Sequence, residues 1–408
     1  MGPGFKQPGL FYFWPMAIIL FDDSAHYTLR PLTFTRPVAN LRLGILTIAE
    51  KWARHLQTDY SYLTQPYLQA KYPVQLQEQN LFINGSVCPD DDLLEAIDRL
   101  RPGQALYHAD YLLAVKLNQT EAAAFTPEQK FVDRVTYNLP HISIRYPDHI
   151  FKKNDTELQR DFAMLTKGRS SANISSTNTI IGTNFFAEED AVAECSTFNT
   201  TNGPIYLGPR TEVWEGTHIR GGLALCHDSQ IKMGAKIYGA TTIGPKSRVG
   251  GEINNAVIWG NSNKGHEGYL GNSVVGEWCN MGADSNNSNL KNNYAEVKLW
   301  DYTTRHFRKT GLQFCGLIMA DHAKCGINTM FNTGTVVGVS ANVFGGGFPR
   351  NFIPDFAWGG AHGFEIYSLD KMLETVKLVY ERKNLELDAV ERQLLTDIFN
   401  LTQPYRVF

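Results

Sequence analysis

Apolar residues recur at every sixth position in the second half of the chain. Eight consecutive positions fit this spacing: Leu207, Val213, Ile219, Leu225, Ile231, Ile237, Ile243 and Val249. The same step connects Ile174, Ile180, Phe186, Val192 and Phe198 upstream. After interruptions it connects Tyr269, Val275 and Met281, and then Met319, Cys325, Phe331, Val337 and Val343. A period of six fits neither an α-helix nor an isolated strand, but it fits a coil with three short parallel strands per turn. The spacing therefore predicts a parallel β-helix at residues 171–348.

Two segments depart from this spacing, Glu252–Gly268 and Ser285–Phe314. Loops that leave one face of a solenoid commonly build a binding site. Beyond the coil, apolar positions between residues 369 and 380 have helical spacing, with Ser368 as the expected N-cap. A second helix is expected near residues 388–399, so that residues 349–408 form a helical extension.

The first half has the alternation of strands and helices that is typical of an α/β domain. Short apolar runs predict strands, and amphipathic spacing predicts helices, in the order strand 17–21, helix 45–56, strand 81–83, helix 91–100 and strand 105–115. We expect a mostly parallel sheet over residues 1–170, with residues 1–15 as a flexible lead-in. Glycine supports the boundary, because only 7 of the 35 glycines precede residue 171.

Composition excludes several classes of function. The formal net charge is −3, which gives no electrostatic case for binding nucleic acid or a membrane surface. No apolar run approaches the roughly 18–20 residues of a membrane span. The six cysteines form no CxxC pair, which favours reduced thiols and a cytoplasmic location.

The richest polar segment is residues 261–294, and it contains a single histidine, His266. Around it lie residues that can donate hydrogen bonds or positive charge: Lys264, Tyr269, Asn280, Lys291, Asn292, Asn293 and Tyr294. A neutral imidazole is a good general base near pH 7, so this segment suggests a base that faces a polar anionic substrate. The alternative is a loop histidine held by ordinary hydrogen bonds.

Four motifs carry a resemblance to a known family. They are GGEI at 250–253, NKGHEGYLG at 263–271, NMGAD at 280–284 and NLKNNY at 289–294. The chain resembles the GlmU family of bifunctional N-acetylglucosamine-1-phosphate uridyltransferases and glucosamine-1-phosphate N-acetyltransferases, and it is most similar to a divergent bacterial branch. The implied architecture is a nucleotidyltransferase-like, Rossmann-like α/β domain followed by a left-handed parallel β-helix and helices, assembled as a homotrimer.

The resemblance implies acetyl transfer from acetyl-CoA to an amino sugar 1-phosphate such as glucosamine 1-phosphate. His266 matches the base and Asn293 the residue that orients it. Gly282 and Ala283 match a turn that contacts acetyl-CoA. The implied substrate-binding residues are Glu252, Lys264, Tyr269, Asn280 and Lys291. This sequence has Asn254 where the family has a substrate lysine, which places the identity of the acceptor sugar in question.

The first half resembles the family less closely. Leu29, Pro31, Leu32 and Thr33 match the LxPLT motif of sugar nucleotidyltransferases, but the glycine-rich loop that precedes it is missing and Val38 replaces a lysine. We expect UTP or another nucleoside triphosphate to contact Leu29, Pro31 and Thr33, with phosphate bound by Arg30, Arg36 and Arg42. Asp110, with Asp22 and Asp23, is the candidate Mg²⁺ ligand. The alternative is a degenerate domain with solvated arginines.

Three other functions compete with this interpretation. The chain could be a sugar-1-phosphate nucleotidyltransferase only, or a non-catalytic scaffold. A zinc carbonic anhydrase on a similar coil needs three converging histidines, and the candidates here (His218, His227, His266 and His322) fall at different phases of the six-residue period. The segment Asp321–Lys324 is interpreted as a surface turn rather than part of a coenzyme groove.

Overall fold

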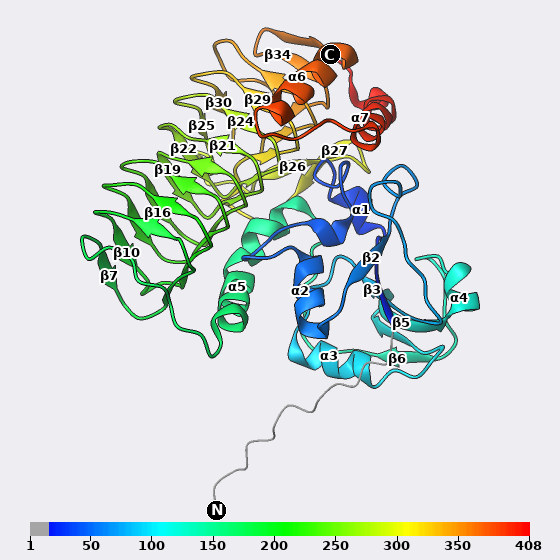
Figure 1. The fold of residues 1–408 in the computed structure, drawn as a ribbon. Helices are drawn as coiled ribbons and strands as arrows, with labels where there is room; N and C mark the ends of the chain where they lie inside the picture. Colours follow the sequence, from blue (N-terminus) through cyan, green and yellow to red (C-terminus); the bar gives the residue numbers. More distant parts are fainter. Residues whose placement is uncertain (1–15) are drawn as a thin grey trace, which may run out of the picture.

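The computed structural model describes residues 16–408. Figure 1 shows a mixed sheet with helices, coloured blue to cyan, beside a long coil of short strands, coloured green to orange. The 20-residue helix α5 (Pro147–Thr166) connects the two parts and lies along the coil. Among the described residues, no helix has both the length and the apolar content that a membrane crossing requires.

The N-terminal sheet has the strand order β2-β1-β3-β5-β4-β6. Its strands are β1 (Ala17–Phe21), β2 (Tyr60–Leu63), β3 (Gln79–Asn84), β4 (Ala105–His108), β5 (Tyr111–Asn118) and β6 (Arg134–Thr136). Three pairings are parallel and two are antiparallel. The single strand expected at 105–115 is a hairpin, because Ala109 turns the chain with φ +50°.

Short helices surround this sheet. They are α1 (Ala25–Thr28), η1 (Val38–Asn40), α2 (Ile48–Leu56), α3 (Asp91–Asp98) and α4 (Gln119–Ala123). Helix α2 begins with a capping box, in which the Thr47 hydroxyl accepts from the Glu50 N–H and the Glu50 carboxylate accepts from the Thr47 N–H. Helix α3 is capped by the Asp90 side chain.

The coil consists of three parallel sheets, which we call faces 1, 2 and 3. Face 1 contains β7 (Thr179–Ile181), β10 (Thr197–Asn199), β13 (His218–Arg220), β16 (Lys236–Tyr238), β19 (Glu252–Asn254) and β22 (Tyr269–Gly271), with the pair β25 (Asn286–Asn287) and β30 (Met330–Phe331) beyond it. Face 2 contains β8 (Phe185–Ala187), β11 (Ile205–Leu207), β14 (Leu223–Leu225), β17 (Thr241–Ile243), β20 (Val257–Ile258), β23 (Val274–Val275), β28 (Ile318–Met319), β31 (Val336–Val337) and β33 (Phe352–Ile353).

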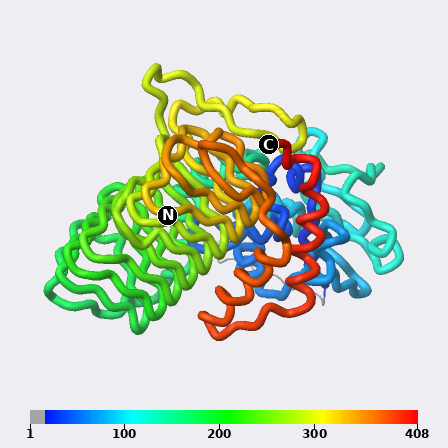
Figure 2. The backbone as a smooth tube through the Cα atoms, turned by 90° about the horizontal axis from the view of Figure 1, so that it is seen from above, coloured from blue at the N-terminus to red at the C-terminus, as the bar shows by residue number. Residues whose placement is uncertain are grey.

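Face 3 contains β9 (Val192–Ala193), β12 (Glu212–Val213), β15 (Gln230–Ile231), β18 (Arg248–Val249), β21 (Asn263–Lys264), β24 (Asn280–Met281), β29 (Lys324–Cys325), β32 (Asn342–Val343) and β34 (Ala357–Gly360). The antiparallel strand β35 (Gly363–Ile366) closes this sheet. Seen from above, successive turns lie side by side along the coil (Figure 2). This parallel β-helix after an α/β sheet confirms the predicted fold class.

The inward positions explain the six-residue spacing and show where it slips. All eight residues from Leu207 to Val249 are buried inside the coil. At three places the inward residue is one position later than predicted: Ala187 replaces Phe186, Ala193 replaces Val192, and Leu270 replaces Tyr269. Phe186 instead packs outward against Leu158 of α5 and its neighbours. A single extra residue at a corner moves the side chains of the next strand to the other face.

The two breaks in the spacing have different structures. Residues 252–268 stay within the coil, where β19 and β20 are separated by a short corner with Asn255 at φ +49°. Residues 288–315 leave the coil and form an antiparallel hairpin, β26 (Lys298–Asp301) and β27 (His306–Lys309). This hairpin protrudes beside the coil in yellow (Figure 2), and Arg308 pairs with Asp148 at the start of α5.

The C-terminal extension folds back onto the coil. It contains α6 (Leu369–Glu381), α7 (Ala389–Leu401) and the short helix η2 (Gln403–Tyr405). The Asp388 side chain caps α7, whereas the Ser368 side chain makes no capping bond to α6. Helix α6 docks through Tyr380, whose ring lies 4.4 Å from that of Trp278 on the coil.

Face 2 of the coil packs directly on the N-terminal part. The Asn154 amide on α5 donates to the Ala240 carbonyl at 2.8 Å, and the Thr242 hydroxyl donates to the Gly44 carbonyl at 2.7 Å. One continuous apolar core extends from Leu29 and Phe34 to Trp259 and Phe356. The segment after α1 is therefore buried between the two parts, and several of the predicted nucleotide-binding residues lie in this buried segment.

Candidate functional site

A pocket of about 660 Å³ lies on the outer side of face 3, between the coil and α6. It contains four of the predicted site residues: His266, Asn280, Gly282 and Ala283. The other residues that line it are Lys232, Arg248, Asn261, Asn263, Gly265, Trp278, Cys279, Met281, Lys324, Ile327, Val379, Arg382 and Lys383. We call this the His266 pocket.

His266 lies at the corner that connects β21 on face 3 to β22 on face 1. Its imidazole is exposed and makes no hydrogen bond or ion pair within residues 16–408. The preceding turn must approach this corner closely, since a Cβ on Gly251 would lie 2.8 Å from the His266 carbonyl oxygen, and Gly251 has φ +74°. The backbone that carries the imidazole is thus closely packed while its ring is free to meet a ligand.

Lys264 lies beneath this corner rather than in the pocket wall. Its side chain points into the coil at a position that β18 fills with Val249, and it is 3% exposed. Its ammonium donates to the carbonyls of His266 at 2.7 Å and Gly250 at 3.0 Å. Burial lowers the pKa of Lys264 to about 8. Lys264 therefore holds the His266 backbone from below and does not face the pocket.

This burial predicts a pH-dependent stability. Between about pH 8 and 10.4 the folded chain has lost the Lys264 proton while the unfolded chain retains it, so stability rises with pH. Relative to Lys264→Met, the wild-type free energy of unfolding should rise by about 2–3 kcal/mol from pH 7 to pH 11. Denaturant titrations across this range measure the difference. The half-exposed Lys236→Met is the matched control, and parallel wild-type and Lys264→Met curves would contradict the prediction.

Five cations line the His266 pocket, and carboxylates are absent from its lining. They are Lys232, Arg248, Lys324, Arg382 and Lys383, and none of them forms an ion pair within residues 16–408. Burial lowers the pKa of Lys383, with a further contribution from Arg248. Burial and Arg248 lower the pKa of Lys232 in the same way. Such uncompensated positive charge favours a polyanionic ligand.

Only weak sequence signals point to these cations. Arg248, Asn263, Asn280 and Lys324 occupy the same outward register position on successive strands of face 3. Arg382 and Lys383 directly follow α6, more than a hundred residues after His266 in the chain. Helical periodicity predicted α6 but not where it docks.

The pocket also has an apolar wall and a close turn. Trp278, Ile327 and Val379 supply apolar surface. Gly282 is required by packing, because a Cβ there would lie 2.4 Å from the Ile327 nitrogen. The next amide N–H, that of Ala283, donates to no acceptor among the described residues. A pocket with cations, an apolar wall and a free amide suits a ligand with both anionic and apolar parts.

Glu252 and Tyr269 lie side by side on the outer side of face 1, around the corner from the pocket. The Tyr238 hydroxyl donates to the Glu252 carboxylate at 2.5 Å. The Tyr269 hydroxyl accepts from the Asn289 amide at 2.9 Å. His266 precedes Tyr269 by three residues, so the corner places these polar groups and the pocket on either side of the imidazole.

Asn293 and Lys291 lie elsewhere in this chain. The Asn293 side chain is exposed on the insert that leaves the coil, and its carbonyl oxygen accepts from the Ala295 N–H at 3.1 Å. Lys291 donates to the Glu296 carbonyl at 3.0 Å and lines a different pocket. Within residues 16–408, no hydrogen bond joins either side chain to His266.

The predicted nucleotide-binding segment is largely buried between the two parts of the molecule. Leu29, Pro31 and Thr33 are buried, and the Thr33 hydroxyl donates to the His26 carbonyl at 2.6 Å. The Arg30 guanidinium lies over the Phe34 ring at 4.7 Å. These contacts with the apolar core, rather than phosphate binding, explain the positions of these side chains.

The remaining two arginines of that set are ion-paired. Arg36 is 5% exposed and pairs with Asp321 of the coil and with Glu277 at 3.2 Å. Its guanidinium also lies 4.8 Å from the Trp259 ring centre. Arg42 pairs with Glu50 at 3.3 Å. This segment thus lacks the glycine-rich loop, and Arg36 and Arg42 form ion pairs with other residues of the same chain.

A second cluster of polar side chains lies at the carboxyl ends of β1 and β3. Asp23 pairs with Arg145 at 2.5 Å and accepts from the Asn84 amide at 3.0 Å. Arg145 lies over the Tyr111 ring at 4.6 Å, and Asp110, exposed in the adjacent hairpin turn, precedes that tyrosine. Ligands of α/β sheets bind beyond the carboxyl ends of strands. Sequence patterns did not single out Asn84 or Arg145.

These carboxylates differ in their fitness for Mg²⁺. Asp22 is buried and accepts from Thr64 at 2.6 Å and from the Val38 N–H at 2.8 Å, so its oxygens are already used. Asp23 and Asp110 could supply oxygens beside substrate phosphates, which is how Mg²⁺ is usually held. Within residues 16–408, no three His, Cys, Asp or Glu side chains are grouped to hold a metal ion.

Residues 18–170 match the family model described as sugar nucleotidyl transferase. The chain is also similar to the bifunctional protein GlmU of Methanocaldococcus jannaschii, with 28% identity over 134 residues, which is 33% of this chain and 27% of that protein. It is 33% identical over 89 residues to the bifunctional protein GlmU of Methanococcus aeolicus, covering 21% of this chain and 20% of that protein. The alignments thus span about a quarter of these relatives.

Two solved structures were compared with the fold. The UDP-N-acetylglucosamine O-acyltransferase LpxA of Moraxella catarrhalis is 11% identical, with 56% of this chain and 97% of that chain covered and a TM-score of 0.21. A hexapeptide transferase family protein of Anaplasma phagocytophilum is 13% identical, with 57% and 92% covered and a TM-score of 0.14. These scores add nothing to the strand pairing described above. Residues 18–170 are thus similar to sugar nucleotidyl transferase domains, and up to a third of the chain is similar to the bifunctional protein GlmU.

Proposed function

We propose that the coil transfers an acetyl group from acetyl-CoA to the amine of an amino sugar 1-phosphate, with glucosamine 1-phosphate as the expected acceptor. The observation that carries this proposal is the His266 pocket, where an imidazole lies beside an apolar wall and five cations that form no ion pair within residues 16–408. Coenzyme A has several phosphates and a long, largely apolar arm. The cations match the phosphates, and Trp278, Ile327 and Val379 match the arm.

In the proposed reaction, His266 takes a proton from the sugar amine as its nitrogen bonds to the acetyl carbon. The carbon–sulfur bond then breaks, and the leaving thiolate takes up the proton that His266 accepted, which gives coenzyme A and returns the imidazole to its neutral form. The Ala283 N–H is available to donate to the carbonyl oxygen as it gains negative charge. Glu252 and Tyr269, with Asn280, are the proposed contacts of the sugar phosphate. Lys264 acts through the His266 backbone, and we propose no contact between it and the substrate.

We propose that Asn293 and Lys291 reach the reacting groups only in the expected homotrimer. Within one chain, both lie on the insert and away from His266. In a cyclic trimer, each coil presents its surface to a neighbouring copy, so an exposed insert can complete a neighbour's site.

We propose that residues 18–170 transfer a nucleotidyl group from UTP, or another nucleoside triphosphate, to the sugar 1-phosphate. The polar edge with Asp23, Asn84, Arg145 and Asp110 supports this proposal, together with the family model. Mg²⁺, bound by phosphate oxygens with Asp110 and Asp23, would neutralise charge on the triphosphate. In this proposal, residues at the open end of the sheet contact the nucleotide in place of the buried Arg36 and Thr33.

Thermal stabilisation by the two substrates separates these activities. A ligand at 100 times its dissociation constant adds about 2.7 kcal/mol to the stability of the folded state. We expect acetyl-CoA to stabilise the wild type and not Lys324→Glu, which reverses one pocket charge. Lys236→Glu, outside the pocket lining, is the matched control and should still respond.

UTP–Mg²⁺ is tested in the same way. Stabilisation by UTP–Mg²⁺ alone would favour a nucleotidyltransferase without acetyl transfer. No response to either substrate would favour a scaffold and contradict both proposals.

A further inference from the structure

A second pocket of about 790 Å³ lies where three distant segments meet. The hairpin β26–β27 forms one wall, the last coil turns around Thr333 and Phe352 form another, and the C-terminal residues 404–407 form the third. We call it the hairpin pocket. Within one chain, it shares no lining residue with the His266 pocket.

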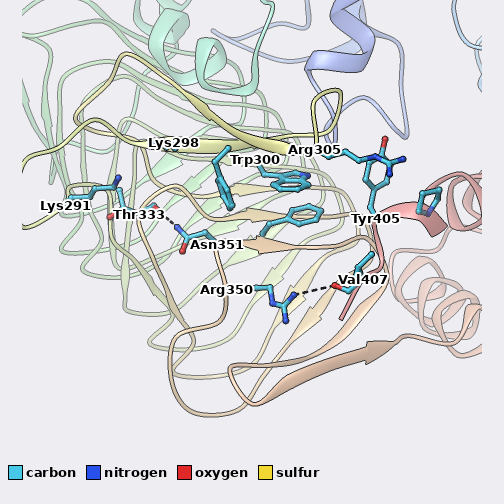
Figure 3. Close-up of a pocket in the computed structure, with 12 residues that line it drawn as sticks. Lys291, Lys298, Trp300, Arg305, Thr333, Arg350, Asn351, Tyr405 and Val407 are labelled. Atoms are coloured by element: carbon cyan, nitrogen blue, oxygen red, sulfur yellow. Dashed lines mark hydrogen bonds between the residues drawn. The ribbon is translucent and has the colours of Figure 1, made fainter.

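Positive charge dominates the hairpin pocket. Its four ionisable side chains other than tyrosine are Lys291, Lys298, Arg305 and Arg350. None of them forms an ion pair within residues 16–408, and carboxylates are absent from the lining. Lys291 lies at one end of the pocket and Arg305 at the other, with Trp300 between them (Figure 3). A ligand that fills this space must carry negative charge.

Aromatic rings make up most of the remaining surface. Trp300 stacks on Phe352 with ring centres 4.2 Å apart, and Phe307 meets the indole edge-on at 5.4 Å. Tyr405 closes the far side under the Arg305 guanidinium at 5.2 Å. Phe307 is 43% exposed because it faces the open pocket and not the apolar core. Such flat, partly exposed surfaces are suited to stacking a planar ring.

One polar atom in this wall lacks a partner. The Trp300 indole nitrogen is buried and donates to no acceptor in the described part of the chain. A buried N–H without an acceptor costs free energy. The charge and the rings of this pocket therefore indicate a ligand with phosphates and a planar ring.

We propose that the hairpin pocket binds a nucleoside diphosphate, with its base stacked among Trp300, Phe307 and Tyr405. Lys298, Arg305 and Arg350 bind the phosphates. The volume is within the range of small-ligand sites, and the mixture of rings with charges at both ends favours a base with phosphates over a lipid chain. Because the hairpin also pairs with Asp148 of α5, the bound nucleotide would lie beside the contact between the two parts of the chain.

The test uses UDP without divalent metal, and hydrogen–deuterium exchange in the full chain as a local readout. UDP should slow exchange in peptides that cover residues 298–309 and 350–353. Lys298→Glu and Arg305→Asn should each raise the UDP concentration needed for this protection by about tenfold or more, because each removes a charge-assisted contact. Asparagine tolerates the left-handed backbone of Arg305, which has φ +55°, so the turn should be preserved.

Controls separate this site from the proposed enzyme sites. Arg220→Glu, an exposed arginine on β13 outside the pocket lining, should leave the protection unchanged. Uridine and inorganic pyrophosphate, which each lack half of the ligand, should both bind more weakly than UDP. No protection of the hairpin at saturating UDP would overturn the proposal, as would equal protection in Lys298→Glu and wild type. Equal binding of pyrophosphate and UDP would overturn the role of the rings.

Discussion

Replacing His266 with alanine should lower the rate of acetyl transfer by about 10²–10⁴-fold, because general base catalysis contributes this much. The coil should remain folded, since the imidazole is exposed and makes no hydrogen bond within the described residues. The measurement is release of coenzyme A thiol under saturating acetyl-CoA and glucosamine 1-phosphate, with the thermal midpoint as a check on folding. The loss should appear in kcat, because in our proposal the pocket cations, and not the base, bind acetyl-CoA.

The matched control is His218→Ala, an exposed histidine on β13 that is absent from the pocket lining. It should retain wild-type turnover. Turnover within a few-fold of wild type in His266→Ala would remove His266 as the base. Equal losses in both variants would indicate damage to the coil rather than to the chemistry.

Replacing Arg36 with alanine should destabilise the chain by about 3–5 kcal/mol, because it leaves a buried carboxylate without its partner. Arg36 pairs with Asp321, which also accepts from the Thr35 hydroxyl at 2.7 Å and the Glu277 N–H at 2.8 Å. This cluster joins the N-terminal part to the coil. Denaturant unfolding measures the loss. The exposed pair of Arg99 and Glu95 provides the contrast, and Arg99→Ala should cost less than about 1 kcal/mol.

A double variant distinguishes the ion pair from general damage. Arg36→Met with Asp321→Asn removes both charges and should recover much of the stability lost in Arg36→Ala. Suppose instead that Arg36→Ala is as stable as wild type but no longer binds UTP–Mg²⁺. Arg36 would then face the nucleotide, as the sequence motif suggested, and the interface described here would be wrong.

The coil was predictable because its constraint is local. Each side of each turn has room for one inward side chain. The apolar residues at every sixth position from Leu207 to Val249 therefore show the coil directly in the sequence. The slips at Phe186, Val192 and Tyr269 were not predictable, because one added residue at a corner changes the register without changing composition. The hairpin at 105–115 was missed for a related reason, since Ala109 and Asp110 interrupt the strand pattern only briefly.

The site was predictable in part. The residues around His266 are close in sequence, and the structure places four of the predicted ones in one pocket. The cations from α6 and the pairing of Arg36 with Asp321 depend on how distant segments dock, and 285 residues separate that pair. Asp321 and His322, expected at the surface, are buried for the same reason. Polar residues at tight coil corners resemble surface turns until a second element covers them.

The most direct test of the central claim is a turnover assay on the full chain with acetyl-CoA, glucosamine 1-phosphate and UTP–Mg²⁺, in which free thiol and pyrophosphate are followed separately. We predict thiol release that requires the amino sugar phosphate, and pyrophosphate release that requires UTP. Thiol release alone would retain acetyl transfer and contradict nucleotidyl transfer from UTP. Absence of thiol release with glucosamine 1-phosphate, and with every other amino sugar 1-phosphate in a screen, would contradict the assignment of the His266 pocket.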